Sequence, residues 1–552
     1  MRTPPSRLLV SLGMMSTALV LSGCDDDSDS RRFRDVTAPT VLSVSPADGA
    51  AGVATDTLVS ATFSDTLLNS SVTDISFTLT NGRPITGEVS LASGDETARF
   101  AAAPSLPLLS SITATLSTSI TDEVGNALAT AYAWSFTTAD GSWGSEALLE
   151  TDDAGQAYAP RVAANAAGHV AAAWVQSDGI HYLMTVNRYV PGTGWQGAET
   201  VQTDLTRNSD KARVVIDAAG NITVVWIQEN AGRYSLWSRR YETGSGWGNA
   251  ELLETDDTGD ANEPEIAIDG DGNVIAVWHQ YDSVRHNVWT NRFEAGVWGT
   301  ATLLESDNNT AVYPHVAMTE SGDAMAIWVQ SDGARSNAAG RYYDAGTDTW
   351  QAVASLENGS GDVQSPRVAI DASGNALAVW YQSDGSVLDV MSNRYVPGSG
   401  WGTAAAISAL NQNGYDPKIA MTPDGDALAV WYQYDGTRYN VWANRYDHTA
   451  GWGNAELLET EDTVSSDTAS VVVDGNGNGV AVWVENDGSG TLNLMANRYV
   501  ADTGWSAAEA IESSTETLNA GAALAVDGGG RITAVWAQSN GAEDSLYANR
   551  FQ

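Results

Sequence analysis

The chain has 552 residues, with 69 acidic against 27 basic side chains and a formal net charge of −42. A surface of this sign repels nucleic acid and bare anionic lipid, so neither is an expected partner. The single cysteine excludes an internal disulfide and a cysteine-rich metal site. The 20 Trp and 53 Gly residues, beside only 7 Phe, favour a turn-rich all-β protein of several domains.

The first 24 residues have the layout of an export signal. Arg2 and Arg7 precede an apolar run over 8–21 that is too short to span a bilayer comfortably. The tetrapeptide Leu21-Ser22-Gly23-Cys24 follows, and it resembles the lipobox of bacterial lipoproteins. The resemblance implies a signal peptide over 1–23 and a lipid on Cys24 that holds the protein on a membrane. An ordinary cleaved signal that ends before a cysteine is the alternative.

Residues 24–36 form a polar, acidic segment that we expect to be a disordered tether. Acidic residues directly after a lipidated cysteine resemble an inner-membrane retention signal in enteric bacteria. In some other bacteria they resemble a surface-export signal. The expected location is therefore the cell envelope, with the choice of membrane left open.

Residues 37–139 read as a β-sandwich. Apolar and polar residues alternate over 41–44, 58–64, 76–80, 112–116 and 134–138, with the hairpin signal Asn81-Gly82 between two of these runs. The segments 45–49, 122–126 and 134–138 resemble the bacterial Ig-like domain of the S-layer (SbsA) type, which implies a spacer or adhesive module without catalytic residues. Asp122 and Asn126 are interpreted as a turn around Gly125, in preference to a metal-binding loop.

The rest of the chain repeats one unit eight times at spacings of 51 to 53 residues. One Trp opens each copy and another recurs in its middle: Trp143, Trp195, Trp247, Trp298, Trp350, Trp401, Trp452 and Trp505, then Trp174, Trp226, Trp278, Trp328, Trp380, Trp431, Trp483 and Trp536. Within a copy, alternation and turn signals predict four antiparallel strands, as in one propeller blade.

The repeat begins at a fourth strand, from Trp143, and ends at a third strand, Asn549-Arg550-Phe551. Pairing these two ends would remove both open sheet edges. The sequence therefore predicts a closed eight-bladed β-propeller over 143–552, with 143–151 completing the blade near 520–551.

Three recurring motifs are interpreted as scaffold. The sixteen repeated Trp residues are predicted to pack between blades, in preference to a sugar-stacking platform. The Asn-Arg-aromatic triplet, whose Arg we place at Arg240 and Arg341 in copies two and four, is predicted to be structural. The Asp-x-x-Gly-Asn turn is predicted to be a tight hairpin, because it lacks the ligands that calcium needs.

No catalytic residue, cofactor or metal site is predicted. The six His residues show no ligand spacing, and no nucleophile or phosphate-loop motif is present. Only two of the basic residues are Lys, at 211 and 418.

Loops between the second and third strands supply the candidate ligand-binding residues: Tyr281, Arg285, His286, Tyr434, Arg438 and Tyr439. They should share one face with the acidic loops that join successive blades. Residues 440–458 are also loosely similar to the repeats of propeller lectins. The first hypothesis is a monomeric, non-catalytic envelope protein that binds a glycan or a protein. A propeller-based glycan hydrolase or lyase, and a structural scaffold in an envelope assembly, are the alternatives.

Overall fold

The computed structural model describes residues 35–552 except 152–154, 256–257, 358, 384, 409–410, 460–463, 487, 514–515 and 520. The predicted signal peptide, Cys24 and most of the predicted tether lie outside the described residues. The described chain is all-β, as predicted, with one short 3-10 helix, η1 (Asn69–Ser71). No helix in this part of the chain is long and apolar enough to cross a membrane.

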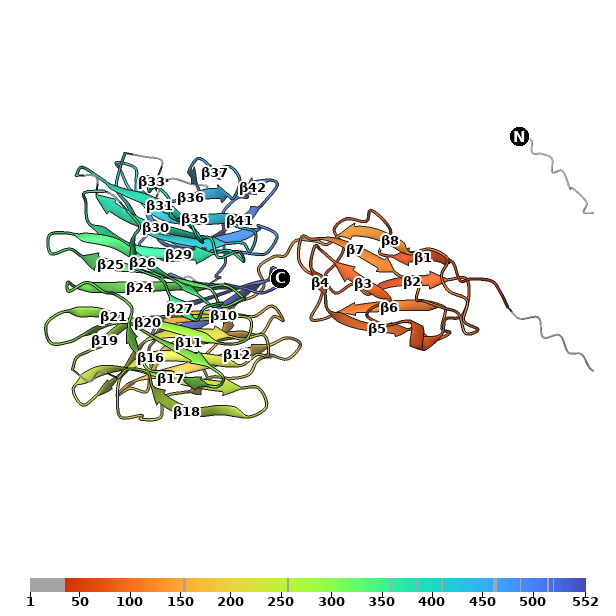
Figure 1. Cartoon of the computed structure of the whole chain (residues 1–552), viewed down its shortest axis with the longest axis horizontal. Coiled ribbons are helices and arrows are strands. Elements are labelled where there is room, and N and C mark those ends of the chain that lie inside the picture. Colours follow the sequence, from red (N-terminus) through yellow and green to blue (C-terminus); the bar gives the residue numbers. More distant parts are fainter. Residues whose placement is uncertain are drawn as a thin grey trace, which may run out of the picture.

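Residues 35–139 form two four-stranded sheets, here called the N-terminal sandwich (Figure 1). Alternate side chains of its strands are buried between the sheets, where Phe77 contacts Phe100 and Trp134 at ring-centroid distances of 5.8 and 5.9 Å. This burial confirms the predicted sandwich. In spatial order, the strands are β1 (Val41–Ser45), β2 (Val59–Phe63), β6 (Thr97–Ala102) and β5 (Gly87–Leu91), then β4 (Pro84–Ile85), β3 (Phe77–Thr80), β7 (Ser111–Leu116) and β8 (Tyr132–Thr137).

The remaining described residues form eight antiparallel sheets, numbered 1 to 8 in chain order. The first strands are β10 (Ala157–Ala164), β15 (Ser209–Ile216), β19 (Ala261–Ile268), β24 (Ala311–Met318), β29 (Val363–Ile370), β34 (Gly414–Met421), β39 (Ser466–Val473) and β44 (Ala523–Val526). The second strands are β11 (Val170–Ser177), β16 (Ile222–Asn230), β20 (Val274–Tyr281), β25 (Ala324–Ser331), β30 (Ala376–Ser383), β35 (Ala427–Tyr434), β40 (Gly479–Asn486) and β45 (Ile532–Ser539).

The third strands are β12 (Tyr182–Val190), β17 (Arg233–Glu242), β21 (His286–Glu294), β26 (Ser336–Asp344), β31 (Leu388–Val396), β36 (Tyr439–Asp447), β41 (Leu492–Val500) and β46 (Asp544–Phe551). Sheet 2 has one continuous fourth strand, β18 (Gly246–Leu252). In sheets 1 and 3 to 7 the fourth strand is split: β13 (Gly194–Trp195) and β14 (Glu199–Thr200), β22 (Val297–Trp298) and β23 (Thr302–Leu303), β27 (Thr349–Trp350) and β28 (Ala354–Ser355), β32 (Gly400–Trp401) and β33 (Ala405–Ala406), β37 (Gly451–Trp452) and β38 (Glu456–Leu457), β42 (Gly504–Trp505) and β43 (Glu509–Ala510).

The split was not predicted, and sheet 6 illustrates the bonds made at the break. The Asn444 side chain donates through Nδ2 to the carbonyl of Gly453, at 3.2 Å, and to the carbonyl of Ile407 in sheet 5, at 3.2 Å. Gly453 N–H in turn donates to Arg445 O. In sheet 6 a side chain thus bonds the carbonyl that lies between the two halves of the fourth strand.

Sheet 8 takes its outer strand from the other end of the repeats. The strand β9 (Ala147–Leu148) pairs with β46, and Trp143 forms an isolated bridge with Phe551. Each first strand lies beside the first strand of the next sheet, and β44 of sheet 8 lies beside β10 of sheet 1.

The repeated Trp residues pack within and between sheets: Trp226 of sheet 2, for example, lies in one apolar cluster with Ala171 and Val186 of sheet 1. The mid-unit Trp is fully buried in every copy, and its indole Nε1 donates to the Gln or Glu two residues later in all eight sheets. The opening Trp packs against the aromatic residue of the triplet in all eight copies. Both sets of Trp therefore build the framework.

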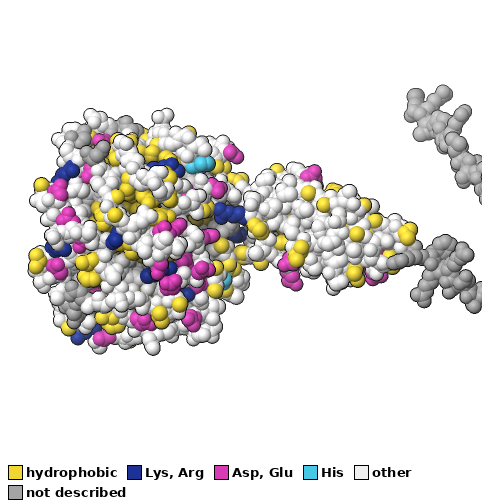
Figure 2. All heavy atoms as spheres, in the orientation of Figure 1, with side chains coloured by type: hydrophobic (Ala, Val, Ile, Leu, Met, Phe, Trp, Pro, Cys, Tyr) yellow, Lys and Arg dark blue, Asp and Glu magenta, His cyan; other side chains and the backbone are white. Residues whose placement is uncertain are grey.

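The N-terminal sandwich is bonded to sheets 7 and 8. Leu108 is buried in the same apolar cluster as Val480 and Ile532, and its N–H donates to Gly529 O at 2.8 Å. Arg531 donates to Leu106 O at 2.9 Å and to the Ser105 hydroxyl. The sandwich thus contacts turns that join first and second strands, and Figure 2 shows basic side chains gathered at this junction.

Candidate ligand-binding sites

The first strands share a bulge that brings one residue of each strand to the same register. The pairing of first and second strands shifts at this point in sheets 1 to 7. One residue of each bulge has a positive φ: Ala159, Lys211, Glu263, Tyr313, Ser365, Asp416 and Thr468. Left-handed backbone at non-glycine residues is strained, and such strain is concentrated at functional sites.

The residue two positions after each bulge residue occupies what we call the axial ring: Arg161, Arg213, Glu265, His315, Arg367, Lys418 and Ser470, with Ala523 at the same register in sheet 8. Five of these eight side chains are basic in type, in a chain that carries a net charge of −42. Both lysines of the chain lie in this region, one at a bulge and one in the ring.

A cavity of 170 Å³ opens where five of the first strands meet, and we call it the axial cavity. His315, Arg367 and Lys418 line it together with Ser470, and Ile419, Val471 and Leu524 supply its apolar lining. Polar groups that converge in a cavity on several strands are typical of a ligand site.

Arg213 and Glu265 form a bidentate ion pair within the ring. Arg213 donates through Nε and Nη2 to the two carboxylate oxygens of Glu265, both at 2.8 Å. Burial would raise the pKa of Glu265, but Arg213 lowers it to about 2. This bidentate geometry gives the pair a fixed orientation between sheets 2 and 3.

Burial lowers the pKa of three other ring residues. Burial lowers the pKa of His315 to about 3, so the imidazole is neutral, and its Nδ1 accepts the N–H of Val368 at 3.3 Å. The remaining proton is therefore on Nε2. Burial and the nearby Arg367 lower the pKa of Lys418 to about 8. Burial, with Arg213 beside it, lowers the pKa of Arg161 to about 10.

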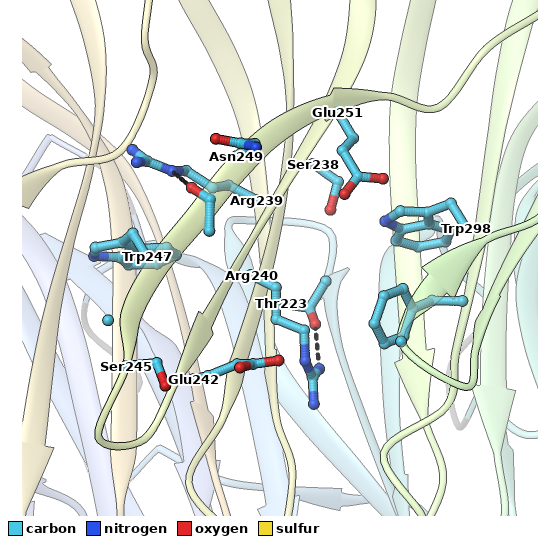
Figure 3. Close-up of a pocket in the computed structure, with 14 residues that line it drawn as sticks. Thr223, Ser238, Arg239, Arg240, Glu242, Ser245, Trp247, Asn249, Glu251 and Trp298 are labelled. Atoms are coloured by element: carbon cyan, nitrogen blue, oxygen red, sulfur yellow. Dashed lines mark hydrogen bonds between the residues drawn. The ribbon is translucent and has the colours of Figure 1, made fainter.

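A second cavity, of 240 Å³, lies between sheets 2 and 3, and we call it the intersheet pocket (Figure 3). The indole rings of Trp247 and Trp298 stand on opposite sides of it, with Arg240 between them. The exposed carboxylates of Glu242 and Glu251 also line it.

The pocket is built partly by an unusual third strand. At the triplet position of Asn, sheet 2 has Arg239, which donates to Gly248 O and to Val201 O, each at 2.8 Å. Arg240 is held by Asp217 at 2.6 Å and by the Thr223 hydroxyl at 2.9 Å. Both guanidinium groups are thus fixed at the edge of the pocket.

The candidate loop residues form two separate groups. In sheet 3, the rings of Tyr281 and His286 lie 5.2 Å apart, and His286 continues to His279 at 5.1 Å. Arg285 is bonded to the carbonyls of Asp307 and Asn309 in the loop that leads to sheet 4. Arg285 therefore stabilises this loop, which is a structural role.

In sheet 6, Tyr439 contacts Tyr434 at 5.3 Å, Tyr432 at 5.7 Å and Tyr415 at 6.0 Å. Arg438 N–H donates to the Asp435 carboxylate in the same hairpin, at 2.9 Å. Tyr415 belongs to a first strand, three residues before Lys418 of the axial ring. The aromatic group of sheet 6 thus extends from the hairpin toward the axis. Neither of the two described cavities is lined by any of the six predicted residues.

The recurring Arg has a structural role. In five sheets its guanidinium lies over an aromatic ring of the next sheet, with Arg188 over Tyr241 at 4.0 Å and, across the junction of the repeats, Arg550 over Tyr189 at 3.9 Å. The assignment of Arg341 to this position is wrong. Its strand pairing places it in the Asn slot, and Tyr342, which stacks on Tyr395 at 5.1 Å, holds the Arg slot.

Two groups of acidic residues and His could offer ligands to a metal among the described residues, and hydrogen bonds explain both. Asp426 and Asp447 are shared by Arg445, at 2.7 and 3.5 Å, and His448 lies 2.8 Å from Asp426. In the other group, Asp122 accepts the N–H groups of Val124 and Asn126, which is the predicted turn. We assign no metal to either group.

Residues 35–138 match the bacterial Ig-like domain family. The N-terminal sandwich is a bacterial Ig-like domain. No curated protein matches the chain.

Similar solved structures include a protein of unknown function from Dyadobacter fermentans, with 12% identity, a TM-score of 0.36, and coverage of 65% of this chain and 98% of that chain. The polysaccharide lyase Uly1 is similar at 11% identity and a TM-score of 0.43, over 66% of this chain and 93% of that chain. An α-L-arabinofuranosidase from Fusarium graminearum is similar at 13% identity and a TM-score of 0.35, over 52% and 92%. At these TM-scores the likenesses carry no argument about this chain.

Proposed function

We propose that this protein is a lipid-anchored component of the bacterial cell envelope whose eight sheets are the blades of a closed β-propeller that binds a glycan without turning it over. The lipid on Cys24 and the Ig-like domain, of the S-layer type, hold the propeller away from the membrane. The cyclic order of the first strands and the pairing of β9 with β46 support closure.

The intersheet pocket is the observation that carries glycan binding. Two Trp side chains flank a polar cavity of 240 Å³ that also presents guanidinium and carboxylate groups. Sugars stack their C–H faces on indole rings and bond their hydroxyls to charged groups, so this combination suits a saccharide. The lining residues Glu242, Ser245 and Glu251 are exposed, so the pocket is open to solvent.

Glycan hydrolysis is the second candidate, because Glu242 and Glu251 line the same pocket. Glycosidases use a pair of carboxyl groups, one of which must donate a proton. Both residues are exposed here, whereas the acid of a glycosidase characteristically lies in an apolar setting. Exposure therefore favours binding over hydrolysis.

Trp247→Ala tests the proposal, with Trp452→Ala as its matched control. Both residues open a repeat and contact the triplet Tyr of their own sheet, at 5.5 and 5.3 Å, but only Trp247 lines the pocket. Full-length protein would be assayed for binding to envelope polysaccharide by Trp fluorescence, and the glycan would be analysed for cleavage. We expect Trp247→Ala alone to weaken binding by about tenfold or more.

Each outcome separates the alternatives. Binding that is equal in the two variants rejects the pocket as the site. Cleaved glycan rejects the non-catalytic proposal and favours a hydrolase or lyase. No binding by the unmodified protein favours a structural scaffold.

A further inference from the structure

The bulge and axial ring positions hold more positive than negative charge. Three ion pairs join Lys211 to Glu263 at 2.9 Å, Arg213 to Glu265 at 2.8 Å, and Lys418 to Asp416 at 2.5 Å. These pairs use all the carboxylates at these positions. Two guanidinium groups, those of Arg161 and Arg367, are left over.

Arg161 and Arg367 have no carboxylate in ion-pair contact within the described chain. Each donates through Nη1 to the carbonyl of the proline before it, at 2.7 Å for Arg161 and 2.9 Å for Arg367. They come from sheets 1 and 5, which are opposite each other in the cyclic order of eight. Arg367 nevertheless contributes to lowering the pKa of Arg161, so the two charges interact across the axis.

Arg161 and Arg367 are half-buried, so this excess of positive charge is only partly solvated and is costly. Among the bulge and ring positions, only Glu263, Glu265 and Asp416 carry a carboxylate, and each of the three already pairs with a cation. A bound anion would offset this cost directly.

The residues that line the axial cavity supply hydrogen-bond donors for such an anion. Lys418 and His315 line it with Arg367, and the neutral His315 presents Nε2–H because Nδ1 already accepts a backbone N–H. A guanidinium, an ammonium and an imidazole N–H form a donor set that matches the oxygens of a carboxylate or sulfate group. A cation would be repelled by the same groups.

We propose that the axial cavity is a binding site for an anionic group of the carboxylate or sulfate class, held by Arg367, Lys418 and the Nε2–H of His315. The group belongs either to a free inorganic oxyanion or to an acidic sugar, and the cavity volume of 170 Å³ suits both. The site is separate from the intersheet pocket and does not depend on the proposed function.

Calorimetric titration of full-length protein, kept in a non-ionic detergent without sugar, tests the site. Sodium sulfate and sodium glucuronate are the two probes. We expect binding of at least one, weakened about tenfold or more by Arg367→Gln and largely retained by Arg367→Lys. Arg99→Gln, which removes an exposed charge from the N-terminal sandwich, is the matched control and should leave binding unchanged.

A stronger response to glucuronate identifies an acidic sugar as the ligand, and a response to sulfate alone identifies a free oxyanion. The unmodified protein gives an independent readout if Arg367→Gln does not fold: its affinity should fall between about pH 7 and pH 9, as Lys418 loses its proton beside Arg367, Asp416 and Arg161. Absence of binding to both probes, or equal binding by Arg367→Gln, would overturn the proposal.

Discussion

At the scale of single residues, the axial ring is a repeat position whose residue type changes from copy to copy. The scaffold positions keep the same residue type in nearly every copy, whereas the ring position holds Arg, Arg, Glu, His, Arg, Lys, Ser and Ala in turn. That variation is readable in the sequence once the copies are aligned. The convergence of these side chains is not, because it depends on first strands of different sheets lying side by side.

His315 should make the stability of the protein depend on pH. Its pKa is about 3 in the folded chain against 6.5 for an ordinary His, because burial outweighs the attraction of Glu265, and Arg367, Arg213 and Lys418 also disfavour its charge. The unfolded chain therefore binds a proton that the native chain does not, and stability falls as pH drops below about 6.5.

We expect His315 to account for about 1 to 2 kcal/mol of the stability lost between pH 7 and pH 5. Urea unfolding of the unmodified protein and of His315→Gln at the two pH values measures this. His279, whose pKa burial lowers to about 4, remains in both proteins and serves as an internal reference. An identical loss of stability in the two proteins would show that His315 does not titrate on unfolding.

At the scale of the element, the turns within a sheet could be predicted from the sequence of that sheet's own repeat. The Asp-x-x-Gly-Asn turns form as predicted: Asp217 accepts the backbone N–H of Asn221 at 2.8 Å, and Gly220 has a φ of +83°. The split of the fourth strand involves a bond to a neighbouring sheet, and the true slot of Arg341 is set by the pairing of β26 with β25. Local patterns do not contain those bonds.

The Gln two residues after each buried Trp should contribute more to the free energy of unfolding than an ordinary surface residue does. Gln433 is fully buried, accepts the Trp431 Nε1–H at 3.1 Å, and donates to Gln412 O at 2.8 Å. Gln433→Ala leaves a buried indole donor without its acceptor, so we expect a loss of about 2 kcal/mol in the free energy of unfolding.

Sheet 7 provides the comparison, since Glu485 holds this position with a longer bond of 3.4 Å from Trp483. Glu485→Gln should leave stability unchanged or raise it slightly. Chemical unfolding monitored by Trp fluorescence measures both variants. A Gln433→Ala protein as stable as the parent would show that this repeated bond contributes nothing.

At the scale of the whole molecule, the N-terminal sandwich and the candidate loops lie at opposite ends of the strands. The sandwich contacts turns between first and second strands, whereas Tyr281, Arg285 and Tyr439 belong to hairpins between second and third strands. Antiparallel strands place these two kinds of turn at opposite sheet ends. The loop face is therefore directed away from the sandwich and, in the proposed envelope arrangement, away from the membrane.

Arg531 fixes this arrangement and marks a departure from the repeat. Sheets 2, 3, 5 and 7 have Asn in its place: Asn221, Asn273, Asn375 and Asn478. The turn itself needs only the backbone, because Asp527 accepts the N–H of residue 531 at 3.0 Å and Gly530 has a φ of +76°. The long side chain instead reaches Leu106 O and the Ser105 hydroxyl of the sandwich.

Arg531→Asn should accordingly keep sheet 8 folded and loosen the junction between the two parts. We expect a larger radius of gyration in small-angle scattering and faster proteolysis near residues 139–142, with thermal unfolding shifted by no more than a few degrees. Leu108→Ala combined with Arg531→Asn should enlarge both effects, because it also removes the apolar contact with Val480 and Ile532. Arg99→Gln again controls for loss of charge. If the scattering and cleavage of the variant match those of the parent, the junction is held instead by Leu108, Asn476 and the Arg498–Asp140 ion pair.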